Sequence, residues 1–271
     1  MRIRNGGEMT QSEIKYLYID GAYFEQVVTK FASDYYGGDT LEIDFAKLGK
    51  EFKRVFYYNA LPPKQRNESQ EEYECRKQAK SREFHVIGRL RGFHVREGVV
   101  RRGSNRNEQK MVDVLIAVDM LSHTMRKNMD MAVLITGDLD FQPLLDALVD
   151  AGMYTILRSD PRTTAGDLTA AADESHPITI TDIYAWATDS FRTSHPFPQS
   201  FSTSSREEIG SLIATGHTLI GDKIGLFHDG SNFCITFPDH NNKGYSIYIR
   251  HNDRKFLERY VSDTRFKFSW D

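Results

Sequence analysis

The sequence has few of the features that mark a secreted, membrane-bound or disulfide-stabilised protein. Only two of its 271 residues are cysteines, Cys75 and Cys234, so it has no disulfide framework and a reducing compartment is expected. Its N-terminal residues lack the apolar centre of a signal peptide, and no run approaches the roughly 18 apolar residues that suggest a membrane span. We therefore expect a cytoplasmic protein with a flexible N-terminus at residues 1–13 and no association with a membrane.

Several common catalytic motifs are missing as well. The nine histidines show neither a His-Glu-x-x-His pattern nor the Cys/His spacing of a zinc site. Neither a Gly-x-Ser-x-Gly elbow nor a P-loop is present, which leaves little support for a serine hydrolase or an NTPase. The formal charge of −3 gives no overall excess of positive charge, so any contact with phosphate must be local.

The first two thirds of the chain alternates between strand-like and helix-like segments. Apolar runs predict strands at 15–19, 54–59, 93–100, 131–136 and 154–157, and the segments between them predict helices at 21–31, 68–91, 107–125 and 141–151. Strands that are apolar on both faces and alternate with helices predict an α/β fold, in which helices cover both faces of a parallel sheet. The helix at 107–125 is apolar on nearly every side and is expected to be buried.

The composition changes after residue 188. Residues 189–205 are rich in Ser, Thr and Pro and predict a linker, which would follow a first domain at 14–188. Residues 206–271 predict a small C-terminal α+β domain of unknown role. Its expected elements are a helix at 206–215, a hairpin at 223–237, a strand at 245–250 and a helix from 253.

Four aspartates lie at or near the predicted carboxyl ends of the strands, where a parallel sheet usually carries its functional residues. Asp20 follows the first strand, Asp138 and Asp140 follow the strand at 131–136, and Asp113 is in the preceding helix. Ligands of such sheets bind beyond the carboxyl ends of the strands. Clustered carboxylates repel one another unless a cation lies between them, and hard oxygen ligands favour Mg²⁺ or Mn²⁺ over zinc. Such ions suit in-line attack on a phosphodiester.

The segments that carry these aspartates are Ile19-Asp20-Gly21, Lys110-Met111-Val112-Asp113-Val114 and Thr136-Gly137-Asp138-Leu139-Asp140-Phe141-Gln142-Pro143-Leu144. In this order they resemble the NYN (LabA-like) domain of the PIN-like nuclease superfamily, over roughly residues 15–188. The resemblance implies a PIN-like fold, metal binding and catalysis by the four aspartates, and a supporting role for Thr136 and Lys110. Because characterised members mostly act on RNA, it implies a ribonuclease that uses Mg²⁺ or Mn²⁺. Single-stranded RNA is favoured and DNA stays open.

Two positions depart from the family pattern. Tyr23 stands where the family often has Asn, so a polar contact near Asp20 is expected to be missing, and Met111 replaces the usual Gly. Both departures favour the chief alternative, a catalytically weak PIN-like module that binds nucleic acid or has a regulatory role. A phosphatase with a phospho-aspartate would need a second Asp where Ala22 stands. A homodimer also stays open.

Positive charge is concentrated just before the second aspartate segment. Between Arg76 and Lys110, eleven Lys and Arg residues stand against three Glu residues. The arginines nearest Asp113, which are Arg101, Arg102 and Arg106, are expected to bind nucleic-acid phosphate. The alternative is a solvated helix face with i,i+4 ion pairs.

Two further aspartates match the motifs less well. Asp229-Gly230 fits the first segment by letter, but the residues after it suit a strand, whereas the nuclease motif should open a helix. Asp119 shares a helix with Asp113, but six residues separate them by about 9 Å of rise and about 240° of rotation. We expect both to be non-catalytic and Asp119 to be buried and hydrogen-bonded.

Overall fold

The computed structural model describes residues 13–102, 107–204 and 209–271, which form two compact units. The first unit contains the chain up to Val27 and residues Phe45–Ile178, and the second contains Val28–Asp44 and Thr179–Asp271. Residues 1–12 of the predicted flexible N-terminus lie outside the described residues. Among the helices of these described ranges, none has the length and apolar character needed to cross a membrane.

A seven-stranded sheet forms the centre of the first unit, in the order β4-β3-β2-β1-β5-β6-β7. Its strands are β1 Lys15–Asp20, β2 Arg54–Ala60, β3 Phe93–Arg102, β4 Asn107–Lys110, β5 Met131–Ile135, β6 Tyr154–Ser159 and β7 Glu174–Pro177. Six strands run parallel, and β4 is antiparallel to β3. The strand order reverses between β1 and β5, and α/β sheets bind ligands beyond the carboxyl ends of the strands at such a reversal.

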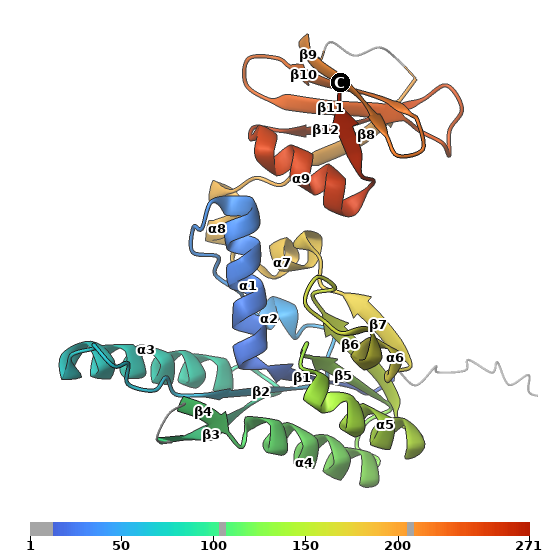
Figure 1. The fold of residues 1–271 in the computed structure, drawn as a ribbon. Coiled ribbons are helices and arrows are strands. Elements are labelled where there is room, and N and C mark those ends of the chain that lie inside the picture. The colour runs from blue at the N-terminus through green and yellow to red at the C-terminus, as the bar shows by residue number, and fades with distance from the viewer. Residues whose placement is uncertain (1–12, 103–106, 205–208) are drawn as a thin grey trace, which may run out of the picture. The chain divides into compact units, whose positions relative to one another are not determined.

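Helices cover both faces of this sheet (Figure 1). The helices on one face are α4 Val112–Met125, α5 Gln142–Asp150 and the short α6 Gly166–Ala170. The other face carries the start of α1 Gly21–Tyr36 together with α2 Phe45–Leu48 and α3 Gln70–Gly88. Because the central strands are covered on both sides, Leu17, Tyr18 and Ile19 are all fully buried. This explains the unbroken apolar runs and confirms the predicted α/β fold.

Two expectations for the helix at 107–125 are wrong. Its first four residues form β4, in which Lys110 pairs with Val99, because the polar sequence Asn-Glu-Gln-Lys offers no apolar helix face. The helix itself begins at Val112 and is not buried all round. Only one side packs on the sheet, and Val114, Val118 and Met125 on the other side are 59%, 53% and 75% exposed.

The second unit contains a six-stranded antiparallel sheet in the order β13-β9-β10-β11-β12-β8. The elements of this unit after Thr179 are α7 Ile180–Trp186, α8 Asp189–Ser194, β8 Gln199–Thr203, β9 Ser211–Thr218, β10 Lys223–His228, β11 Phe233–Pro238, β12 Ser246–His251, α9 Arg254–Thr264 and β13 Phe268–Trp270. Helix α9 packs on β11 and β12 through apolar residues such as Phe256 and Leu257. The predicted hairpin, the strand after it and the helix from 253 are confirmed.

Two other predictions for this region are wrong. The expected linker at 189–205 contains α8 and the edge strand β8, because Thr188 caps α8 and the residues of β8 pair with β12. In place of the helix expected at 206–215, strand β9 begins at Ser211 and pairs with β10, while residues 206–208 lie outside the described residues. The domain boundaries at 188 and 206 stay predictions.

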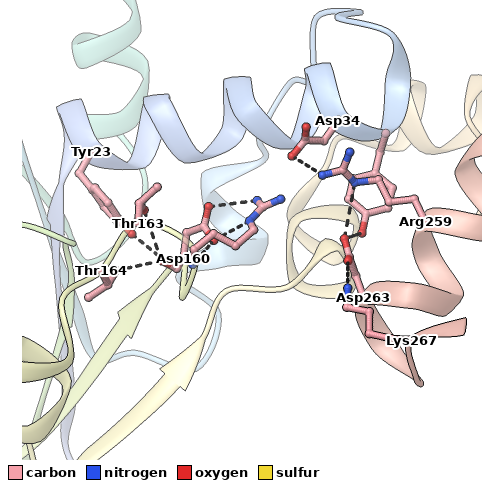
Figure 2. Close-up of polar contacts among 10 residues, drawn as sticks. Tyr23, Asp34, Asp160, Thr163, Thr164, Arg259, Asp263 and Lys267 are labelled. Atoms are coloured by element: carbon pink, nitrogen blue, oxygen red, sulfur yellow. Dashed lines mark hydrogen bonds and ion pairs between the residues drawn. The ribbon is translucent and has the colours of Figure 1, made fainter. Parts of the chain in front are cut away.

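Residues Val28–Asp44, which include the end of α1, pack within the second unit. Tyr35 donates a hydrogen bond to Asp263 (2.7 Å). Figure 2 shows the ion pair between Asp34 and Arg259 (3.0 Å). The ring of Tyr36 lies edge-on against that of Phe191, with centroids 4.9 Å apart. The second unit is therefore assembled from two separate stretches of the chain.

Candidate functional site

Asp20 is held at the carboxyl end of β1 by two hydrogen bonds. The backbone N–H of Tyr23 donates to its Oδ1 (3.2 Å) and the hydroxyl of Thr136 donates to its Oδ2 (3.1 Å). Only 8% of Asp20 is exposed. A side chain at Gly21 would place a Cβ 2.6 Å from the carbonyl oxygen of Tyr58, so glycine lets the chain turn from β1 into α1 this close to β2.

The segment after β5 brings two more carboxylates to the same edge. The hydroxyl of buried Thr136 accepts a hydrogen bond from the Asp138 N–H (3.3 Å) while it donates to Asp20, so it joins the two segments. Asp138 caps the short 3₁₀ helix Leu139–Phe141, and its Oδ1 accepts from the Asp140 N–H (3.0 Å). Thr136 thus contacts both Asp20 and the backbone of Asp138, and its supporting role in the site stays a prediction.

Tyr23 connects three segments at this edge. Its ring lies so close to Gly137 that a Cβ at that glycine would overlap it. Its hydroxyl accepts a hydrogen bond from the backbone N–H of Asp160 (2.7 Å), just beyond β6 (Figure 2). The expectation that tyrosine leaves a polar contact missing is therefore incomplete, because Tyr23 makes polar contacts through both its backbone and its side chain.

Asp160 is a buried carboxylate at this edge that the sequence analysis missed. Its two oxygens accept from the Arg162 side chain at 2.8 and 3.0 Å, and its carbonyl accepts from the hydroxyls of Thr163 and Thr164 (Figure 2). Because Arg162 balances its charge, Asp160 orders the loop after β6 rather than adding a negative charge to the site. The signal in the sequence is an Asp directly after a strand, as at Asp20.

Asp113 lies in the first turn of α4. Val112 fixes the start of this helix against β3, since a Cβ at Gly98 would lie 2.5 Å from its side chain. Met111, the residue before α4, has a φ of 91°, in the left-handed region that favours glycine. The glycine usual at this position in the NYN pattern thus has a conformational reason, and this chain carries backbone strain there.

The electrostatics show that the carboxylates influence one another. The pKa of Asp20 is raised to about 6, mainly by burial and also by the charges of Asp113 and Asp138, while its two hydrogen bonds oppose the shift. Partial desolvation raises the pKa of Asp113, with a contribution from the charges of Asp138 and Asp140. We call these four residues the aspartate cluster. Its members come from three segments that meet where the strand order reverses.

The donor set suits a hard cation, but it does not form a closed cage. The cluster offers only carboxylate oxygens, which are the ligands that Mg²⁺ and Mn²⁺ prefer. Within the described ranges, no three carboxylate, histidine or cysteine side chains lie close enough to enclose an ion as they stand. The donor chemistry therefore fits, and the approach of the carboxylates to an ion would have to accompany its binding.

The predicted phosphate-binding residues are not placed. The backbones of Arg101, Arg102 and Lys110 lie in β3 and β4, but their side chains, like the whole of Arg106, lie outside the described residues. Lys110 pairs with Val99 through its backbone only one residue before Met111, which puts β4 directly next to the start of α4. Their contacts with nucleic acid stay predictions.

The two aspartates set aside from the motifs have other partners. Asp119 accepts from the Tyr58 hydroxyl and from Arg96, both at 3.0 Å, and is half-buried. Asp229 is exposed in the turn between β10 and β11, where its Oδ1 accepts from the N–H groups of Ser231 and Asn232. Asp229 belongs to the second unit and opens no helix, whereas Asp20 does.

Comparison with known proteins gives one family match. The family model of the NYN domain matches residues 14–179, which contain the whole aspartate cluster. A crystal structure of a protein of unknown function from Vibrio parahaemolyticus RIMD 2210633 is similar at 20% sequence identity, with a TM-score of 0.46; the match covers 65% of this chain and 96% of that one. No curated protein matches this chain.

Proposed function

Because the chain belongs to the NYN domain family, part of the PIN-like nuclease superfamily, we propose that it is a metal-dependent ribonuclease that hydrolyses RNA phosphodiester bonds at the aspartate cluster. The observation that carries this proposal is the mutual influence of Asp20, Asp113 and Asp138. At the reversal of strand order, the charges of Asp113 and Asp138 raise the pKa of Asp20, and the charges of Asp138 and Asp140 raise the pKa of Asp113. Such uncompensated negative charge is suited to a divalent cation.

Asp20, Asp113, Asp138 and Asp140 would hold Mg²⁺ or Mn²⁺. When bound, the ion would supply an activated water and charge neutralisation at the phosphate. The chain's own contribution is positioning. Thr136 and the N–H of Tyr23 fix both oxygens of Asp20, and the cap bond of Asp138 fixes one of its oxygens. An aspartate held in this way keeps its orientation as the ion and the substrate arrive.

The proposed substrate is RNA, with single strands favoured. The preference for RNA over DNA comes from the resemblance to characterised NYN proteins, which mostly act on RNA. Arg101, Arg102 and Arg106, with Lys110, are proposed to contact backbone phosphates, because this positive segment leads directly to Asp113.

A second candidate function is that of a catalytically weak module that binds nucleic acid or has a regulatory role. The strain at Met111 favours it, because this residue immediately precedes the helix that carries Asp113. The carboxylates of the described residues also do not enclose an ion as they stand. Binding of RNA without turnover would be the signature of such a module.

The test is cleavage of a labelled single-stranded RNA during a manganese titration. The wild type should cleave, excess EDTA should stop cleavage, and Asp138→Asn should lose it. Asp146→Asn removes an exposed carboxylate from α5 of the same unit and should keep activity. Undiminished cleavage in EDTA would contradict metal dependence, and tight RNA binding without cleavage would support the weak module.

A further inference from the structure

A group of arginine and histidine side chains lies between α4 and β3, apart from the aspartate cluster. Arg54 begins β2, His94 and Arg96 are in β3, and His123 and Arg126 are in the last turn of α4 and directly after it. We call these five residues the basic cluster. Three of them pack around the buried ring of Phe56. The centroids of the His94 and His123 rings lie 5.0 and 4.8 Å from it, and the Arg96 guanidinium lies at 5.8 Å.

The positive charge of this cluster is only partly balanced. Asp119 pairs with Arg96 at 3.0 Å, and the charges that act on the His123 ring are those of Asp119 and of three arginines, Arg54, Arg96 and Arg126. Arg54 donates to Nε2 of His94 (2.9 Å), so that nitrogen acts as an acceptor. Burial and the neighbouring arginines lower the pKa of both histidines, although Asp119 opposes this.

The basic cluster begins in the same row of the sheet as Asp20. Asp20 is paired with Tyr58, and Tyr58 with Arg96, so the three residues lie side by side on successive strands. With neighbouring strands about 4.8 Å apart, Arg96 lies about 10 Å from Asp20 across the sheet. Arg54 lies further along, level with Tyr16, four residues before Asp20. The cluster thus leads away from the aspartates along β3.

This side of the unit is open to a ligand. In the described part of the chain, β4 pairs with residues 99–102 of β3, and residues 93–98 pair with β2 alone. The side chain of Arg96 is 44% exposed, and Arg54 and Arg126 are exposed. An edge strand that carries exposed cations presents both charge and backbone donors to a neighbouring molecule.

We infer that the basic cluster binds backbone phosphates of the RNA strand whose cleavage we propose, on the part that extends from the aspartate cluster along β3. This inference rests on the proposed function. Phosphate binding needs positive charge that is not fully balanced within the protein, and the cluster has an excess of two such charges over Asp119. RNA bound there would pass the exposed side chain of Arg96 and extend from the aspartate cluster toward Arg54 and Arg126.

The binding test uses a labelled single-stranded RNA 12-mer in EDTA, so that no cleavage occurs. The double variant Arg54→Gln/Arg126→Gln should bind about tenfold more weakly, and its slope of log affinity against log salt should fall by about 1.4, for two lost phosphate contacts. The matched control Lys50→Gln/Lys255→Gln removes two exposed lysines elsewhere and should change neither value. Equal affinities and slopes for the two double variants would overturn the inference.

A second readout needs no variant. Addition of the 12-mer should shift the ring proton NMR signals of His94 and His123, while the signal of His240, exposed in the second unit, should stay in place. Inorganic phosphate at the same phosphate concentration should shift them far less. Unmoved His94 and His123 signals at saturating RNA, or equal shifts from inorganic phosphate, would overturn binding of a strand.

Cleavage of the 12-mer by the wild type in manganese, measured beside its binding in EDTA, separates this inference from the proposed function. If the wild type cleaves no RNA at all while the binding difference persists, the nuclease proposal fails and the phosphate site stands. If the wild type cleaves and the two double variants bind alike, the phosphate site fails alone.

Discussion

At the scale of a single residue, the buried carboxylate of Asp20 lowers the stability of the folded protein when it is ionised. This carboxylate is fixed by Thr136 and by the N–H of Tyr23, yet burial and the charges of Asp113 and Asp138 raise its pKa to about 6. The folded protein therefore resists ionisation of a group that must be ionised to hold a cation. Binding of an ion would remove that penalty.

The first prediction concerns the pH dependence of the metal-free protein. The unfolded chain loses the Asp20 proton near the ordinary pKa of 3.8, whereas the folded chain keeps it until about pH 6. The contribution of Asp20 to the free energy of unfolding should therefore fall as pH rises from about 4 to about 6 and then stay constant. Asp20→Asn should be more stable than the wild type at pH 7, by on the order of 2 kcal/mol.

Urea unfolding in EDTA at several pH values measures this difference. The free energies of unfolding of wild type and Asp20→Asn should separate as pH rises from about 4 to about 6 and differ by a constant amount above that. Asp146→Asn, in which an exposed carboxylate is lost, should follow the wild type throughout. Parallel curves for wild type and Asp20→Asn would mean that the buried carboxylate carries no such penalty.

The second prediction concerns the strained residue before α4. Met111 has a φ of 91°, and an L-residue in the left-handed region costs about 1–2 kcal/mol. Met111→Gly should raise the free energy of unfolding by about 1 kcal/mol, because glycine adopts this conformation freely but loses more backbone entropy on folding. Met111→Ala keeps the strain and should give no such gain. Equal stability of the Gly and Ala variants would contradict this account.

At the scale of elements, the site depends on the start of α1 and on the loops after β5 and β6. These three segments meet at Tyr23, whose ring covers Gly137 and whose hydroxyl accepts from the Asp160 N–H. The loops after β5 and β6 therefore both contact a side chain of α1. Tyr23 is therefore a positioning residue, which acts on the aspartates through the loops it contacts.

The third prediction follows from this contact. Tyr23→Phe keeps the ring over Gly137 but leaves the N–H of Asp160 without its acceptor, which should cost about 1–3 kcal/mol of stability. Cleavage by this variant should be slower at saturating RNA, because the loop after β6 loses its tie to α1. Tyr154→Phe removes an exposed hydroxyl that donates to Glu174 and is the matched control. Equal activity and stability of the two variants would contradict a positioning role.

Most elements of the first unit could be predicted because its strands are covered on both faces. Continuous apolar runs such as that ending in Asp20 have few other uses in a soluble fold. The start of α4 could not be placed from the sequence, since the turn at Met111 requires a conformation that methionine rarely adopts. The segment 189–205 failed for another reason. Its Ser and Thr residues cap a helix and form an edge strand, and composition alone does not separate these uses from a linker.

The candidate site could be predicted in part. Asp20, Asp138 and Asp140 follow strands whose carboxyl ends share one edge, so their neighbourhood follows from the topology. Asp160 was missed because only the tertiary structure shows that Arg162 balances its charge and that Tyr23 contacts its backbone. The basic cluster likewise depends on the register of β2 with β3 and on the packing of α4, neither of which a charge count reveals.

At the scale of the whole molecule, the two units do not coincide with continuous stretches of sequence. Residues Val28–Asp44 belong to the second unit, although they lie within the predicted first domain at 14–188. Tyr35 and Tyr36 are both buried, and their ring partners there include Phe256 and Phe191. A chain that ends at residue 188 would keep the aspartate cluster but lose these partners.

The fourth prediction is therefore that the chain ending at residue 188 keeps its folded seven-stranded sheet, whereas the C-terminal end of α1 is unfolded. Loss of the packing around Tyr35 and Tyr36, and of the pair between Asp34 and Arg259, removes on the order of 3–5 kcal/mol of local stabilisation. Trypsin should then cut after Lys30, a bond that the full chain protects within α1. Cleavage of a dinucleotide should persist in the shorter chain, because the aspartate cluster lies wholly in the first unit. If both chains resist trypsin equally at Lys30, residues 14–188 fold as an independent domain. Val28–Asp44 then needs no packing partner after residue 188.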